Sequence, residues 1–209
     1  MKLNAEAITK LLAWAYEKAV QGGAPKTQSA VELAEEYMRR EGTLTEKANA
    51  LIRAQNTKAA ATGFLTGLGG LVTLPVAVPA NIASAIYLQL RMVAAIAILS
   101  GCDPEDDRVK ALSIACLAGN AAKGILKNAG IAIGTKLTEQ VLARMSGEVA
   151  KRVNQAVAVK LAAKLGQNGA ASLAKIVPVV GGVTNALFDG ITTNIVGNVA
   201  RDTFVGKTA

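Results

Sequence analysis

Apolar and polar residues recur with a helical period along the first part of the chain. From Asn4 to Val20, leucine, isoleucine and alanine occupy one side and charged residues the other, which predicts an amphipathic helix. The same pattern predicts a second helix over Ser29–Arg40. A third helix should begin at Thr43-Leu44-Thr45-Glu46, which has the sequence of a capping box with Thr43 as N-cap, and end near Ala61.

The following stretch, Thr62 to Gly101, is the most apolar of the chain and carries one formal charge, Arg91. A segment of this kind must lie in a protein core or in a bilayer. Its glycines and prolines weaken or break helices, so residues 63–78 are expected to form either a bent helix or a loop. Pro79 suits the first turn of a helix, which should run from Ala80 to about Ser100.

This apolar helix carries a polar stripe. Asn81, Ser84, Tyr87 and Arg91 fall within a sector of about 120° on a helical projection. Its length, about 20 residues, would span a membrane. A central arginine costs roughly 2.5–3.5 kcal/mol on insertion scales, so we favour a buried hairpin over a transmembrane one. Reversible exposure of the hairpin at a lipid surface remains a second interpretation.

Further helices are predicted after Gly101. Asp103 and Pro104 should cap a helix that reaches about Asn128 and contains Asn120, with acidic residues at its positive end. These acids lack the glycine turn of a calcium loop, so a structural role is favoured over a metal site. A basic helix is expected from Lys136 to Leu165.

The segment Ile176 to Ala200 resembles the central apolar stretch, because it is interrupted by glycine and proline and has one charge, Asp189. Asn185, Asp189 and Thr192 share one helical face. An isolated charge in a core is very costly, so we hypothesise that Arg91 and Asp189 form a buried ion pair. The candidate residues for a polar pocket in the core are Arg91, Asp189, Asn81, Gln89, Asn120 and Asn185.

Charge is unevenly distributed. Residues 1–107 carry ten basic and eleven acidic residues, which gives a net charge of −1. Residues 108–209 carry thirteen basic and four acidic residues, which gives a net charge of +9. The basic residues are either a solvated face or a surface that binds phosphate of lipid headgroups. Nucleic acid is disfavoured, since aromatic residues for base stacking are missing among them. The candidates for a membrane- or partner-facing surface are Lys151, Arg152, Lys160 and Lys164.

The composition argues against an enzyme. The chain has no histidine, which removes the commonest general base and most zinc sites. It has neither a Gly-x-Ser-x-Gly elbow nor a phosphate-binding loop. Cys102 and Cys116 have no evident activating partner, and two cysteines without a preceding signal peptide indicate a reducing, cytoplasmic location. No catalytic residue, metal ligand or cofactor is therefore predicted.

Three blocks of sequence carry a family resemblance: GFLTGLGGLVTLPVAVPANIASAIYLQLRMVAAIAILSG, LSIACLAGNAA and KIVPVVGGVTNALFDG. In this order they resemble the bacterial EcsC protein family over about Gly63 to Phe204. The family is named after a protein encoded beside the components of an ABC transporter, and it has no established activity. The resemblance implies a bacterial helical protein that is cytoplasmic or associated with a membrane.

We therefore expect an all-α protein, a compact bundle of about seven or eight helices with a buried hairpin interrupted by glycine and proline. Residues 1–209 should form one EcsC-like domain, with N-terminal helices over 1–61 and the family core over 62–209. We expect a non-enzymatic protein at the inner face of the bacterial membrane, an accessory to a transporter or secretion system. Its partners would be an anionic membrane surface, a membrane protein or a lipid ligand, and its low share of charged residues, 18%, is compatible with an oligomer. The alternatives are a soluble protein-binding module, such as an immunity protein or chaperone, and a membrane-active protein that exposes its hairpin.

Overall fold

The computed structural model describes residues 4–22, 27–62, 78, 80–131, 142, 145–173 and 190–206, and within them the side chains of all but 59–62, 80–81, 166–173 and 190–191. These residues contain eight α-helices, one short 3₁₀-helix and no strand, as the sequence predicts. The elements are α1 (Ala5–Gln21), α2 (Ala30–Met38), α3 (Leu44–Thr62), α4 (Ala80–Leu99), α5 (Asp107–Cys116), η1 (Gly119–Ala121), α6 (Ala122–Asn128), α8 (Gly147–Leu173) and α9 (Gly190–Phe204).

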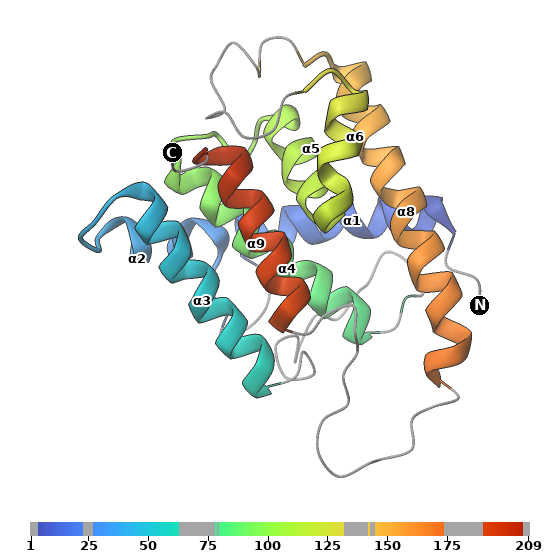
Figure 1. Ribbon diagram of the computed structural model, residues 1–209, viewed down its shortest axis with the longest axis horizontal. Coiled ribbons are helices and arrows are strands. Elements are labelled where there is room, and N and C mark those ends of the chain that lie inside the picture. Colours follow the sequence, from blue (N-terminus) through green and yellow to red (C-terminus); the bar gives the residue numbers. More distant parts are fainter. Residues whose placement is uncertain are drawn as a thin grey trace.

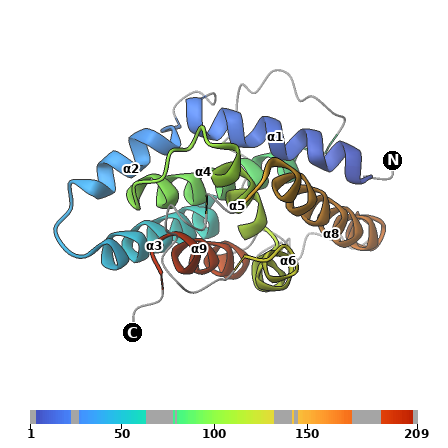
Figure 2. The same ribbon diagram turned by 90° about the horizontal axis from the view of Figure 1, so that it is seen from above.

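Helix α4 lies at the centre of the bundle (Figure 1). Seen from above, α1 and α2 cover one side of it, and α3 and α9 cover the other (Figure 2). Helix α8 closes one end of the bundle by packing on α1 and α5. Because α1, α2 and α3 all pack against α4, the N-terminal helices share one hydrophobic core with the later ones.

The apolar helix of the central stretch is a core helix in this fold. From Ala83 to Leu99, every residue is buried except Leu88 and Ile98, which are half-buried. The window Ile82–Leu99 has a mean hydropathy of 1.9, enough to span a membrane, yet 83% of it is buried within the protein. Residues 63–77, the other arm of the predicted hairpin, lie outside the described residues, and the hairpin itself stays a prediction.

Side-chain caps fix where the first three helices begin. Asn4 accepts a hydrogen bond from the Ala7 backbone N–H at 2.8 Å. Thr43 and Glu46 form the predicted capping box, with hydrogen bonds of 3.2 and 2.7 Å. Ser29 and Glu32 form a second one, with bonds of 3.1 and 2.7 Å. Helix α2 thus begins immediately after the residue at which the sequence pattern placed its start.

The helix expected between Asp103 and Asn128 is divided in the structure. Asp106, rather than Asp103, caps α5 by accepting a 2.8 Å hydrogen bond from the Arg108 backbone N–H. The helix then ends, and Gly119 adopts a φ of +57°, a conformation that favours glycine. A Cβ atom there would lie 3.2 Å from Ile195 of α9. The break therefore allows η1 to approach α9 closely.

The basic helix also has different bounds from those expected. Met145 and Ser146 are not helical, and α8 begins at Gly147. The Ser146 hydroxyl accepts a hydrogen bond from the Val149 backbone N–H at 3.3 Å, which caps the new start. The helix continues to Leu173, beyond the predicted end at Leu165.

A glycine contact between α3 and α9 gives a test of this packing. A Cβ at Gly197 would come within 2.8 and 2.9 Å of two carbons of Ile52, a side chain that is only 2% exposed. Because interiors are closely packed, Gly197→Ala should lower the free energy of unfolding by about 1–2 kcal/mol, although alanine favours helix. Urea unfolding measures this change.

The matched control is Gly124→Ala on α6, where a Cβ would meet nothing within 4 Å. This change should raise stability by about 0.5–1 kcal/mol. The double variant Ile52→Ala/Gly197→Ala should lose less free energy of unfolding than the two single variants lose together. Equal stabilisation by both glycine changes would contradict the close contact of α3 with α9.

Candidate functional site

Arg91 is a buried cation in the middle of α4, with 5% of its surface exposed. Its Nη1 donates to the Gln28 carbonyl oxygen at 3.0 Å, and its Nη2 donates to Gln55 Oε1 at 2.9 Å. These bonds join α4 to the residues before α2 and to α3. Burial lowers the pKa of Arg91 from its usual value, because the charged form loses its hydration.

Several polar atoms around Arg91 lack partners among the described residues. They are Arg91 Nε, Gln55 Nε2 and the hydroxyl of Tyr87, which lies one turn before Arg91 on α4. Burial raises the pKa of Tyr87, and the nearby guanidinium opposes this shift. The surroundings of Arg91 are therefore rich in hydrogen-bond donors and poor in negative charge.

The counter-charge of Arg91 is not among the described residues. In that part of the chain the salt bridges are Lys10–Glu6, Arg40–Glu36, Arg108–Asp106, Arg152–Glu148 and Arg201–Asp202. Asp189 and Glu139 are the acidic residues that lie outside it. The ion pair of Arg91 with Asp189 consequently stays a prediction.

The structure describes the side chains of three of the predicted polar residues, Arg91, Gln89 and Asn120, and these three do not form a single cluster. Gln89 precedes Arg91 by two positions, which places it about 200° away around α4. Gln89 is buried, whereas Asn120 is exposed on η1. Asn185 and the Asn81 side chain lie outside what the structure describes.

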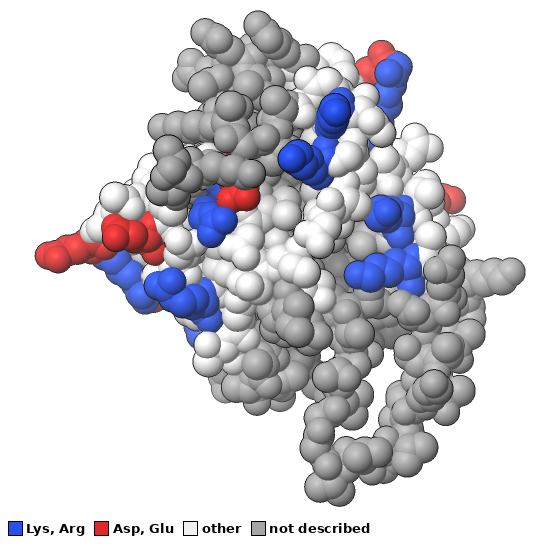
Figure 3. Space-filling model, in the orientation of Figure 1, with Lys and Arg blue, Asp and Glu red and all other residues white. Residues whose placement is uncertain are grey.

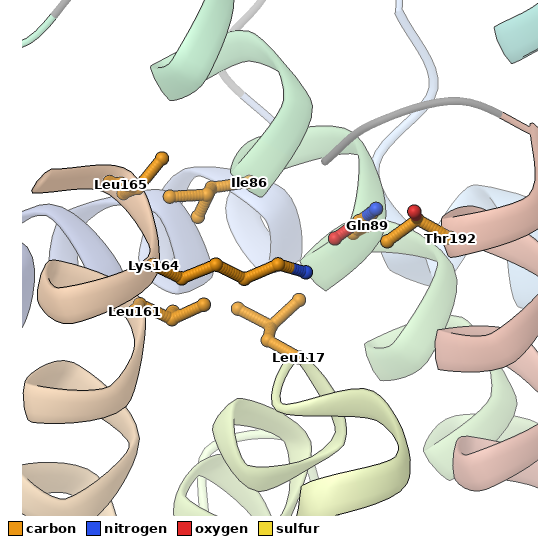
Figure 4. A pocket seen from close by; sticks show the side chains of 7 residues that line it. All are labelled: Ile86, Gln89, Leu117, Leu161, Lys164, Leu165 and Thr192. Carbon is orange, nitrogen blue, oxygen red and sulfur yellow. The ribbon is translucent and has the colours of Figure 1, made fainter. Parts of the chain in front are cut away.

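Gln89 lines a pocket between α4, α8 and α9 (Figure 4). Its amide is 3% exposed, and Nε2 has no partner among the described residues. Lys164 extends from α8 across the pocket, with its ammonium group toward Gln89 and Thr192 (Figure 4). The sequence assigned Gln89 to the core and Lys164 to the surface, and only the packing of α8 on the bundle brings them together. The remaining lining residues are Ile86, Leu117, Leu161 and Leu165.

The predicted basic residues of α8 are all exposed, and α6 extends the same surface. Figure 3 shows Lys and Arg side chains over α6 and α8, with few acidic side chains on this face. Glu148 is the one acidic residue of these two helices, and it pairs with Arg152. Val159, a large hydrophobic residue, is 54% exposed on the same helix. We call this surface the α6–α8 basic face; its members are Lys123, Lys127, Lys151, Arg152, Lys160 and Lys164.

Cys116, Asp103 and Asp106 make hydrogen bonds within the local fold. Burial raises the pKa of the Cys116 thiol to about 12, and its Sγ donates to the Leu112 carbonyl at 3.2 Å. This thiol is not activated as a nucleophile. Asp103 and Asp106 accept hydrogen bonds from backbone N–H groups. Among the described residues, no group of three or more histidine, cysteine or acidic side chains could hold a metal ion.

The predicted ion pair is testable by a double-mutant cycle. If Asp189 neutralises Arg91, Arg91→Met and Asp189→Asn should each lower the free energy of unfolding by about 3–5 kcal/mol. The double variant should lose less free energy of unfolding than either single variant, because each single change leaves an uncompensated charge and the double variant has none. Urea unfolding of the four proteins gives the coupling energy.

A control cycle combines Arg91→Met with Asp202→Asn, whose partner is Arg201. That cycle should be additive within about 0.5 kcal/mol. Equal additivity in the Asp189 cycle would show that another group compensates Arg91.

Comparison with known proteins gives one match. No curated protein and no solved structure matches the chain. A family model described as the EcsC protein family matches residues 5–205. The match includes α1, α2 and α3, which lie before the blocks that carry the resemblance in the sequence. The chain belongs to the EcsC protein family.

Proposed function

We propose that this protein is a non-enzymatic, membrane-associated accessory that docks at the inner face of the bacterial membrane through the α6–α8 basic face. The observation that supports this proposal most directly is the concentration of exposed positive charge on two neighbouring helices. Six basic residues lie on α6 and α8 against one acidic residue, Glu148.

The expected strength of such docking follows from lipid electrostatics. Each lysine or arginine close to an anionic leaflet contributes about 1 kcal/mol, and the attraction decays within a Debye length. Four or five residues in contact would contribute about 4–5 kcal/mol, which corresponds to reversible binding with a Kd of about 0.2–1 mM. The half-exposed Val159 lies between charged turns of α8, where it could enter the headgroup layer.

The burial of α4 favours docking over insertion. Exposing this helix to lipid would separate it from α1, α2, α3 and α9 at once and would also open the surroundings of Arg91. A surface interaction requires none of these changes. An acidic protein partner would also fit this positive face. If the protein does not bind vesicles, an acidic protein is the alternative partner.

Vesicle co-sedimentation tests the proposal. Full-length protein should sediment with vesicles that contain phosphatidylglycerol, remain in solution with pure phosphatidylcholine, and dissociate at high salt. Lys151→Gln/Lys160→Gln should weaken binding about thirty-fold, since two charges of about 1 kcal/mol each are removed.

The control variant, Arg39→Gln/Arg53→Gln, lowers the net charge by the same amount at exposed positions of the α2–α3 side. It should retain most of the binding. Equal losses for the two variants would refute a dedicated basic face, and absence of sedimentation at low salt would refute membrane docking.

A further inference from the structure

We infer that the pocket between α4, α8 and α9 binds one anionic amphipath, with its oxyanion headgroup at Lys164 and Gln89 and its acyl chain against the leucines and isoleucine of the wall. The inference rests on the proposed function for the source of the ligand, a membrane lipid or its degradation product. The site itself is argued from the pocket residues alone.

The polar end of the pocket favours an anion. Gln89 is more than nine-tenths buried, and its Nε2 has no partner among the described residues, which is unfavourable for a buried donor. The Lys164 ammonium lies at the same end of the pocket in Figure 4. An ammonium group and an amide N–H donate hydrogen bonds, so a carboxylate or phosphate oxygen between them would be bound by both charge and hydrogen bonding.

The rest of the lining favours a hydrocarbon chain. Ile86 of α4, Leu117 after α5, and Leu161 and Leu165 of α8 surround the stem of Lys164 (Figure 4). A free inorganic anion would gain nothing from these side chains. An acyl chain would gain favourable free energy in proportion to the apolar surface that it removes from water.

Lys164 controls the room available for such a ligand. The empty cavity is about 20 Å³, enough for about one water molecule. The stem of Lys164 lies across the pocket, and this residue is exposed on its outer side. A lysine stem can shift outward while its ammonium stays beside Gln89, and the acyl chain would take the place of the stem.

The position of Lys164 connects this pocket with the α6–α8 basic face. It belongs to the outward face of α8, together with Lys160, and also reaches into the pocket. A protein docked on that face would hold the mouth of the pocket near the headgroups. One lipid anion could then bind there in a 1:1 complex.

Isothermal titration calorimetry with soluble amphipaths tests the inference. Full-length protein is titrated below the critical micelle concentration with dodecyl phosphate, dodecanoate, dodecyltrimethylammonium and inorganic phosphate. We expect saturable 1:1 binding of at least one of the two anionic amphipaths. The cationic amphipath and inorganic phosphate should show no binding at the same concentrations.

Three variants assign the binding to the pocket. Lys164→Met keeps the apolar stem and removes the charge, and it should weaken binding about ten-fold or more. Gln89→Leu removes the unpaired amide without adding a polar group to the core, and it should weaken binding several-fold. Arg53→Met, which removes an exposed cation of α3 outside the pocket lining, should leave the affinity unchanged. Circular dichroism checks that each variant is folded.

Several outcomes would overturn the inference. Inorganic phosphate that binds as tightly as dodecyl phosphate would show that the acyl wall is not used. Equal losses for Arg53→Met and Lys164→Met would indicate general surface attraction. Binding of the cationic amphipath with equal affinity would indicate a purely apolar contact. If 1:1 binding survives while vesicle docking fails, the pocket stands and the proposed membrane function falls; the reverse result removes the pocket alone.

Discussion

The burial of α4 is the constraint on which the rest of the structure depends. A helix of such low polarity must be covered on all sides in a folded, water-exposed protein, and α1, α2, α3 and α9 supply that cover. Each of these helices is amphipathic because one side faces α4 or its neighbours and the other faces solvent. The N-terminal helices are therefore part of the core, and the family match from residue 5 agrees with this.

Arg91 fixes the orientation of α4 within this hydrophobic core. A helix lined only with alanine, leucine and isoleucine could rotate or slide with small losses of packing energy. The guanidinium must instead meet the Gln28 carbonyl and Gln55 Oε1, because a rotation of α4 that broke these bonds would leave a buried charge without partners. The charge thus selects one register of α4 against α2 and α3, although it contributes little to net stability.

The fold class, the limits of α1, α2 and α4, and the capping box at Thr43 were predictable because they depend on local periodicity and nearby side chains. The break at Gly119 was not, since it follows from the approach of Ile195, which is distant in sequence. The candidate site divides in the same way. Lysines on α8 were predictable as exposed, but the meeting of Lys164 with Gln89 depends on how α8 packs on the bundle.

The sequence of helix α8 contributes both to the hydrophobic core and to the charged surface. Its inner residues, among them Val153 and Val157, complete the core beside α1 and α5, while its outer residues carry the positive charge. Lys164 lies at the boundary, with an apolar stem over the leucines and a charged end that solvent and Gln89 can both reach. An anion with a hydrocarbon chain satisfies both halves of this boundary, whereas a water molecule satisfies only the polar half. The proposed docking surface and the proposed pocket for a lipid anion would therefore share one residue, Lys164.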